Sequence, residues 1–120
     1  MVTALIVEDS LTDRERLTCF LKESGVAVVE ATSSEDALHK LQSRLPDMVF
    51  LDVVLPGQSG FEFCRNLKTN TQTQSIPVVI CSIKTTEADK LWGSMLGADA
   101  YLTKPVDPQQ LSATLQKVMG

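Results

Sequence analysis

The 120-residue sequence lacks the features that would place it in a membrane or on a nucleic acid. It has no apolar run near the ~20 residues that a membrane helix requires, and its N-terminus carries no basic-then-apolar signal peptide. The net charge of −4 argues against sequence-independent binding to nucleic acid, which requires a basic surface. These absences predict no membrane insertion and no nucleic-acid partner.

The cysteines and the single histidine exclude further classes of protein. The three cysteines (Cys19, Cys64 and Cys81) are widely spaced and form neither a disulfide framework nor a zinc signature. Their odd number and apolar neighbours predict reduced thiols in a cytoplasmic protein. The single histidine, His39, stands next to Lys40, and we expect it to be a solvated helix residue rather than a metal ligand.

What the sequence does contain is a regular alternation of strand and helix patterns. Five short apolar runs are expected to be strands, namely 3–8, 26–30, 48–52, 76–82 and 100–103. Segments with helical spacing follow each run, and the chain length suits one domain over residues 1–120. This alternation predicts an α/β fold in which helices cover both faces of a parallel sheet. We expect a doubly wound, flavodoxin-like (βα)5 fold with strand order 2-1-3-4-5.

The helical spacing also predicts which side chains face the core. The segment after Ser33 carries Leu38, Leu41 and Leu45 at this spacing. A later segment has a strong amphipathic stripe, made of Ala88, Leu91, Trp92, Met95 and Leu96. We expect Met95 to pack in the core, whereas Trp92 suits either core packing or a role as an anchor for a partner.

Polar and charged side chains stand where the predicted strands end. Glu8 and Asp9 come at the end of the first strand, and Asp52 ends the third. Ser82 ends the fourth strand, and Lys104 follows the fifth. In a doubly wound sheet, ligands bind outside the carboxyl ends of the strands, at the switch between strands one and three. We therefore expect all five side chains to rim one pocket.

Three carboxylates against one lysine leave this pocket with a surplus of negative charge. Like charges within ~4–6 Å disfavour joint ionisation, so either one acid takes up a proton or a cation lies among them. Hard carboxylate oxygens with open positions suit Mg²⁺ or Mn²⁺. A carboxylate, a divalent cation, a lysine and a hydroxyl are together the parts needed for phosphoryl transfer. In this interpretation Asp52 is the nucleophile that forms an aspartyl-phosphate, and Glu8 and Asp9 hold the ion.

The donor of the phosphoryl group is not expected to be a nucleotide bound by this chain, because the sequence contains no glycine-rich phosphate loop. A flavin- or nucleotide-binding module of the same fold is an alternative interpretation. Such a module needs a phosphate-binding loop and stacking aromatic residues after the first strand. Here residues 9–12 are acidic and free of glycine, which favours the phosphoryl-transfer interpretation.

Four segments of the chain match the motifs of a known family. They are LIVEDS at Leu5–Ser10, LDVVLPGQSG at Leu51–Gly60, PVVICS at Pro77–Ser82 and GADAYLTKP at Gly97–Pro105. In order and spacing they cover the whole chain, which closely resembles the CheY-like receiver domain of bacterial response regulators. The resemblance implies a two-component signalling protein rather than an enzyme, one that catalyses only its own phosphorylation and slow dephosphorylation.

The resemblance implies a role for each residue of the predicted pocket. Asp52 would accept the phosphoryl group from a phosphohistidine on a sensor histidine kinase or a histidine phosphotransfer protein. Glu8, Asp9 and Asp52 would bind Mg²⁺, joined by the backbone carbonyl of Val54. Lys104 would contact the phosphoryl group.

Ser82 and Tyr101 match the paired switch positions of the family. The resemblance implies that the Ser82 hydroxyl moves toward the phosphoryl group while the Tyr101 ring turns inward. This change would alter the surface of the fourth helix, fifth strand and fifth helix, where a downstream protein target would dock. The resemblance also implies a cis peptide bond between Lys104 and Pro105.

Several positions depart from the commoner family pattern. Glu8 replaces a more frequent aspartate, Ile83 stands where a small residue is usual, and Val106 stands where a larger one is frequent. Val54 and Lys84 flank the path of a hydrolytic water, and neither can act as a general base at neutral pH. We therefore predict a phospho-form that hydrolyses slowly.

The output of the protein has more than one interpretation. A receiver without an effector domain would signal by docking, and we expect a role in motility or taxis signalling. Residues 8–21, EDSLTDRERLTCFL, resemble the pilus-motility branch of the family more than the flagellar branch. A phosphate sink, an intermediate relay receiver and a constitutive protein-binding pseudo-receiver are the alternatives.

Overall fold

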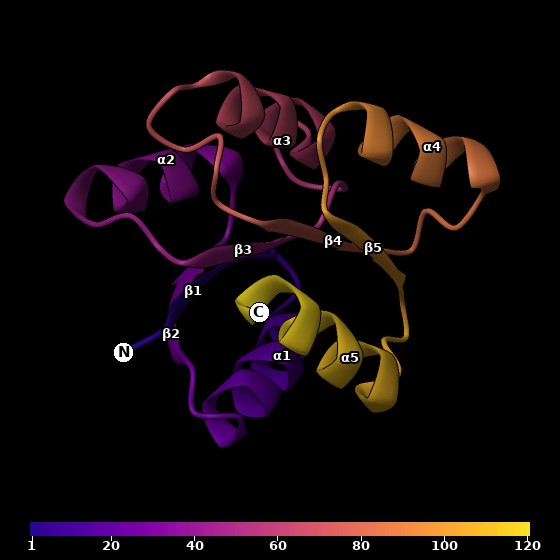
Figure 1. Ribbon diagram of the computed structural model, residues 1–120. Coiled ribbons are helices and arrows are strands. Elements are labelled where there is room, and N and C mark those ends of the chain that lie inside the picture. The colour runs from indigo at the N-terminus through magenta and orange to yellow at the C-terminus, as the bar shows by residue number, and fades with distance from the viewer.

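In the computed structural model, which describes residues 1–120, five strands alternate with five helices (Figure 1). The strands are β1 (Thr3–Val7), β2 (Ala27–Ala31), β3 (Met48–Leu51), β4 (Val78–Ser82) and β5 (Ala100–Thr103). The helices are α1 (Leu11–Glu23), α2 (Ser34–Ser43), α3 (Gly60–Thr69), α4 (Glu87–Met95) and α5 (Pro108–Met119). All neighbouring strands pair in parallel in the order β2-β1-β3-β4-β5, which confirms the predicted doubly wound fold.

Helices cover both faces of the sheet. Figure 1 shows α1 and α5 on one face and α2, α3 and α4 on the other. Successive residues of a strand point to opposite faces, so each face has its own apolar core. Leu5 and Val7 of β1 lie in the core beside α2 and α3, whereas Ala4 and Ile6 lie in the core beside α1 and α5. Burial on both faces explains why the strands are continuous apolar runs in the sequence.

The parallel pairing brings the carboxyl ends of the strands to one edge of the sheet. Two backbone hydrogen bonds continue the ladders just past the strand ends. The N–H of Asp52 donates to the carbonyl of Val7 (3.0 Å), and the N–H of Lys104 donates to the carbonyl of Ser82 (2.9 Å). These bonds hold Asp52 beside the end of β1 and Lys104 beside the end of β4.

Each helix begins at a polar N-cap residue, whose side chain accepts a hydrogen bond from a backbone N–H of the first turn. These residues are Ser10, Ser33, Ser59, Thr86 and Asp107. The cap at Ser10 starts α1 immediately after the acidic residues at the end of β1, so its first turn lies over the same edge of the sheet. No helix combines the length and the apolar character that crossing a bilayer requires.

The cysteines are unpaired, as predicted. Cys64 and Cys81 are buried and Cys19 is exposed. Burial raises the pKa of Cys64 to about 11 and that of Cys81 to about 12, so both thiols stay protonated and pack as small apolar groups. His39 is exposed on α2, which confirms the prediction of a solvated residue.

The apolar stripe of α4 faces solvent, contrary to the predicted core face. Leu91, Trp92 and Met95 are 63%, 49% and 69% exposed, so the prediction that Met95 packs in the core is wrong. The residue that α4 buries is Gly93. A Cβ atom at Gly93 would lie 3.0 Å from Cδ2 of Tyr101. Because α4 meets β5 through this narrow glycine contact, its large side chains turn outward.

The buried face of α2 also differs from the prediction. Leu41 is buried as expected, and Ala37 is buried beside it. Leu38 and Leu45, however, are exposed. Leu45 lies beyond the end of α2, where helical spacing no longer determines the direction of a side chain.

Candidate functional site

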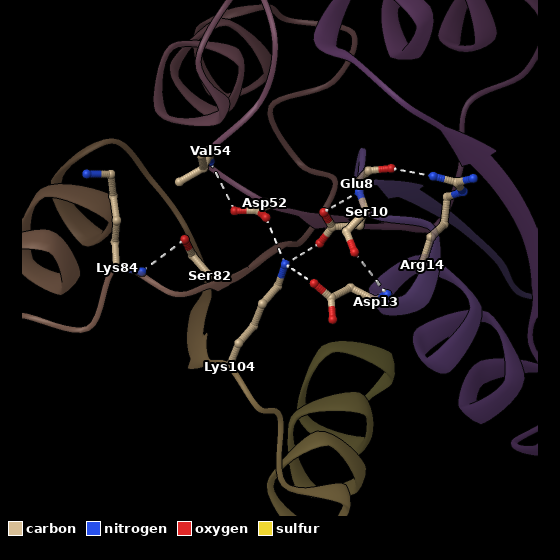
Figure 2. Close-up of polar contacts among 9 residues, drawn as sticks. All are labelled: Glu8, Ser10, Asp13, Arg14, Asp52, Val54, Ser82, Lys84 and Lys104. Carbon is tan, nitrogen blue, oxygen red and sulfur yellow. Dashed lines mark hydrogen bonds and ion pairs between the residues drawn. The ribbon is translucent and has the colours of Figure 1, made fainter.

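Three carboxylates surround the ammonium group of Lys104 at the carboxyl edge of the sheet (Figure 2). Its Nζ atom donates hydrogen bonds to Glu8 Oε1 (2.5 Å), Asp52 Oδ2 (2.8 Å) and Asp13 Oδ2 (2.9 Å). Glu8 follows β1, Asp52 follows β3 and Asp13 comes from α1. The Glu8 and Asp52 side chains are each 6% exposed, so these two ion pairs lie largely out of water.

Local backbone hydrogen bonds hold the second oxygen of each buried carboxylate. Asp52 Oδ1 accepts a bond from the N–H of Val54 (3.0 Å), and Glu8 Oε2 accepts one from the N–H of Ser10 (3.1 Å). Each carboxylate therefore uses one oxygen for the backbone and the other for Lys104. Charge-assisted bonds on both oxygens fix the orientation of the two side chains before any ligand arrives.

Asp13 and Arg14 belong to this site, although neither is among the residues predicted from the sequence. Arg14 Nη1 donates to the backbone carbonyl of Glu8 (3.0 Å), and Arg14 Nε pairs with Glu30 Oε1 (2.8 Å). Arg14 thereby ties the end of β1 to β2. A signal for both residues was available, because a helix that starts just after Asp9 must bring its first turn over the same edge of the sheet.

The clustered charges shift the ionisation of the site. Burial, reinforced by the charge of Asp52, raises the pKa of Glu8, although the hydrogen bond from Lys104 opposes this shift. Burial alone would lower the pKa of Lys104, but hydrogen bonds to the three carboxylates outweigh it and raise that pKa. The hydrogen bond from Lys104 in turn lowers the pKa of Asp13. Lys104 is therefore held as a cation within a surplus of carboxylates.

The acidic side chains fit a divalent cation. One carboxylate oxygen from each of Glu8, Asp9 and Asp52 lies within 4.8 Å of the other two. Glu8 and Asp52 are buried and Asp9 is exposed, so this group opens toward solvent on one side. Mg²⁺ binds through a few carboxylate oxygens and keeps several waters, which suits such an open acidic edge. The backbone carbonyl of Val54 stays a predicted fourth ligand.

The predicted switch residues both bond to the backbone of Lys84. Ser82 is fully buried at the end of β4, and its Oγ accepts a hydrogen bond from the N–H of Lys84 (3.2 Å). The hydroxyl of Tyr101 donates to the carbonyl of the same residue (2.7 Å). Burial raises the pKa of Tyr101, which keeps its hydroxyl protonated as a donor. The loop after β4 therefore connects the two predicted switch side chains.

The departures from the family pattern lie around the site. Val54 and Ile83 are exposed apolar side chains on the loops that follow β3 and β4. The peptide bond between Lys104 and Pro105 is cis, as the resemblance implied. The next residue, Val106, lines a cavity described below.

A cavity of about 240 Å³ adjoins the site between α1 and the segment that leads from β5 into α5. Its polar wall includes Glu8, Asp13 and Lys104, and its apolar wall includes Phe20 and Val106. The site therefore has open space on the side of Lys104 that faces α1 and α5.

Comparisons with known proteins agree with this geometry. A family model described as the response regulator receiver domain matches residues 4–116. The chain is 40% identical over 120 residues to Protein PilH of Pseudomonas aeruginosa, covering 100% of this chain and 99% of that protein. It is 39% identical over 115 residues to the phosphate regulon transcriptional regulatory protein PhoB of Escherichia coli. That match covers 96% of this chain and 50% of PhoB, so the chain spans about half the length of that relative.

A solved structure shows the same fold. The chemotaxis response regulator CheY4 of Vibrio cholerae has a TM-score of 0.90 and 32% sequence identity, with 98% of each chain covered. Receiver domains are signalling proteins rather than classical enzymes, and these matches do not favour the flavin- or nucleotide-binding alternative. With a family model matched over nearly the whole length and a relative of nearly equal size, the chain belongs to the response regulator receiver family of two-component signalling proteins.

Proposed function

We propose that Asp52 of this receiver accepts a phosphoryl group from a phosphohistidine on a sensor histidine kinase or a histidine phosphotransfer protein. The position of Asp52 carries the proposal. Its carboxylate is buried at the end of β3, with one oxygen bonded to the N–H of Val54 and the other to Lys104. An amide donor and a cation beside one carboxylate are groups that stabilise the charge of a transferring phosphoryl group.

The transfer would proceed by in-line displacement at phosphorus. A carboxylate oxygen of Asp52 attacks the phosphorus atom and forms an O–P bond, while the N–P bond of the donor breaks. The donor imidazole nitrogen keeps the electron pair of that bond. Lys104 donates hydrogen bonds to the phosphoryl oxygens, and the hydroxyl of Ser82 adds another after it turns toward them.

The metal would be held by Glu8, Asp9 and Asp52, with the backbone carbonyl of Val54. When bound, Mg²⁺ or Mn²⁺ offsets negative charge on the carboxylate and phosphoryl oxygens. The 4.8 Å grouping of the carboxylate oxygens and the surplus of acids around Lys104 support this assignment.

Removal of the divalent cation is expected to stop phosphorylation, because the acidic pocket then repels an anionic donor. Incubation with acetyl phosphate and Mg²⁺ should raise the intact mass by one phosphoryl group, and excess EDTA should prevent the increase. Addition of Mn²⁺ after the EDTA should restore it. An increase that persists in EDTA would contradict the metal assignment, and no increase in any condition would contradict the proposed function itself.

Lys104→Ala is expected to slow phosphorylation of Asp52 about a hundredfold, the usual effect of removing one donor that stabilises developing charge. The time course of the intact mass with acetyl phosphate and Mg²⁺ measures this rate. Lys22→Ala is the matched control, because Lys22 is an exposed lysine in the last turn of α1. Equal rates for Lys104→Ala and the wild type would show that Lys104 has no role in the transfer.

The phosphoryl group would act on the rest of the molecule through Lys84. Movement of Ser82 Oγ toward the phosphoryl group removes the acceptor of the Lys84 N–H, and Tyr101 bonds to the carbonyl of that residue. Tyr101 packs against Gly93 of α4. The change would thus reach the exposed apolar face of α4, which we assign to target docking together with β5 and α5. The exposed side chains are Leu91, Trp92 and Met95.

The cellular role proposed is signalling in motility, in keeping with the likeness to Protein PilH and with the N-terminal segment. A phosphate sink would be phosphorylated in the same way but would bind no downstream target, whereas a relay receiver would bind a further phosphotransfer protein and pass the phosphoryl group to its histidine. Slow loss of the phosphoryl group is part of the proposal, since Val54 and Lys84 supply no general base.

Three unpaired cysteines support a cytoplasmic location.

A further inference from the structure

The ammonium group of Lys104 has as many acceptors as it has hydrogens. A lysine ammonium carries three N–H donors, and in this protein all of them are directed to carboxylates. Figure 2 shows Lys104 reaching from the end of β5 toward carboxylates that come from β1, β3 and α1. Two of them, Glu8 and Asp52, are among the three residues grouped to hold a metal ion, and Asp13 is not.

Asp13 differs from the other two carboxylates in how it is held. It is the third residue of α1, and its backbone N–H donates to Oγ of the N-cap Ser10 (3.4 Å). The N-terminal turn of a helix favours a negative side chain, so Asp13 is stabilised there without any metal ion. Its side chain is 36% exposed, whereas that of Lys104 is 12% exposed. Asp13 therefore presents a fixed anion to Lys104 from the solvent side of the site.

Lys104 also has room to leave the site. The cavity of about 240 Å³ between α1 and α5 is lined by Lys104 itself, as well as by Glu8 and Asp13. When Glu8 and Asp52 bind a divalent cation, their attraction for the ammonium group falls. A flexible lysine with four methylenes could then rotate into this cavity and away from Asp52.

We propose that Asp13 is a positioning residue, which holds the ammonium of Lys104 beside Asp52 once the other two carboxylates have bound the metal ion. This inference rests on the proposed phosphorylation of Asp52. The 2.9 Å bond to Asp13 leaves Lys104 two N–H donors for the phosphoryl oxygens. Because a misplaced catalytic group loses much of its effect, the loss of this bond slows the transfer.

The competing expectation is that Asp13 slows the phosphorylation of Asp52. A carboxylate near the entering phosphoryl group repels it, and removal of that charge would then speed phosphorylation. The two effects predict opposite changes in rate, so a single substitution separates them. Asp13→Asn removes the charge and keeps the size of the side chain.

The test compares phosphorylation rates at saturating Mg²⁺ and acetyl phosphate in wild type, Asp13→Asn, Lys104→Ala and the double variant. Asp13→Asn is expected to slow phosphorylation about five- to tenfold, as the loss of one charge-assisted contact at a reacting centre does. In the Lys104→Ala background the same substitution should change the rate by less than about twofold, because Asp13 acts through Lys104. Asp13→Glu, which restores the charge, should recover most of the rate.

Glu62→Gln is the matched control. Glu62 occupies the same third position of α3 after its N-cap Ser59, and it lies on the exposed surface. This variant loses the same helix-terminal charge but should keep the wild-type rate. Denaturant unfolding of each variant separates a change in rate from a change in stability.

An unchanged or faster rate in Asp13→Asn would overturn the inference while leaving the proposed function standing. A slowing that persists undiminished in the Lys104→Ala background would overturn it as well, because Asp13 would then act without Lys104. If wild type gains no phosphoryl group at all, both the proposed function and this inference fail.

Discussion

Asp52→Asn is expected to abolish phosphorylation and to leave the fold intact. The amide has no anionic oxygen with which to attack phosphorus, so no O–P bond forms. The asparagine oxygen can still accept the hydrogen bond from the Val54 N–H, which holds the backbone after β3. Lys104 keeps its bonds to Glu8 and Asp13. The intact mass after incubation with acetyl phosphate and Mg²⁺ should therefore stay constant, and the urea midpoint should stay near that of wild type.

Asp47→Asn is the control for this experiment. Asp47 precedes β3 at the opposite end from Asp52, and its Oδ2 accepts a hydrogen bond from the N–H of Thr3 (2.7 Å). Asp47 and Asp52 are therefore the same residue type at opposite ends of β3, and only Asp52 lies in the site. Asp47→Asn should be phosphorylated like wild type. A full mass increase in Asp52→Asn would place the phosphoryl group elsewhere and contradict the account.

Gly60→Ala is expected to destabilise the protein by roughly 3 kcal/mol, at the upper end of the cost of overpacking. Gly60 is the first residue of α3, and its N–H donates to the carbonyl of Val53 (3.0 Å). An added Cβ would lie 2.0 Å from the carbonyl oxygen of Asp52 and 2.5 Å from Cα of Val53. Both neighbours are backbone atoms, so either α3 or the end of β3 must move. Urea unfolding measures the loss.

The second consequence of Gly60→Ala concerns the site. One of the two backbone segments that can give way carries Asp52, so a variant that still folds should also phosphorylate more slowly. Gly25→Ala is the control, because a Cβ at Gly25 meets no atom within 4 Å. Because Gly25 has a positive φ of 83°, alanine at this position is expected to destabilise the protein by about 1 kcal/mol through backbone strain alone. If Gly60→Ala lowers the free energy of unfolding by no more than Gly25→Ala does, the expected collision is contradicted.

The fold was predictable because its signal is local and repeated. Strands buried on both faces are apolar runs, and a parallel sheet brings their ends together by topology alone. The positions of Glu8, Asp52 and Lys104 at strand ends were therefore enough to predict that they meet at one edge of the sheet. No knowledge of any side-chain contact was needed. The resemblance to receiver domains supplied the proposed switch roles of Ser82 and Tyr101, which periodicity cannot assign.

The parts that sequence reasoning missed depend on the packing of helices against the sheet. Helical spacing identifies an apolar stripe but not which way the helix is turned, so it placed Met95 inside although it is exposed. The contact that decides the orientation of α4 is the one between Gly93 and Tyr101. Neither residue belongs to the apolar stripe, so the stripe could not reveal it. The start of α1 could have placed Asp13 near this edge, but its contact with Lys104 depends on how α1 packs. Its partner Lys104 is 91 positions away in the chain, and only the placement of α1 brings them together.

The most direct test of the account is to locate the phosphoryl group chemically. Borohydride reduces an aspartyl-phosphate to homoserine, and peptide mass analysis then identifies the modified position. After incubation with a phosphohistidine donor or acetyl phosphate in the presence of Mg²⁺, the account predicts homoserine at residue 52 and at no other acidic position. Homoserine at Asp9, Asp13 or another aspartate, the longer five-carbon amino alcohol at Glu8, or no reduced residue in a protein whose mass has increased would contradict the claim that Asp52 is the phosphoacceptor.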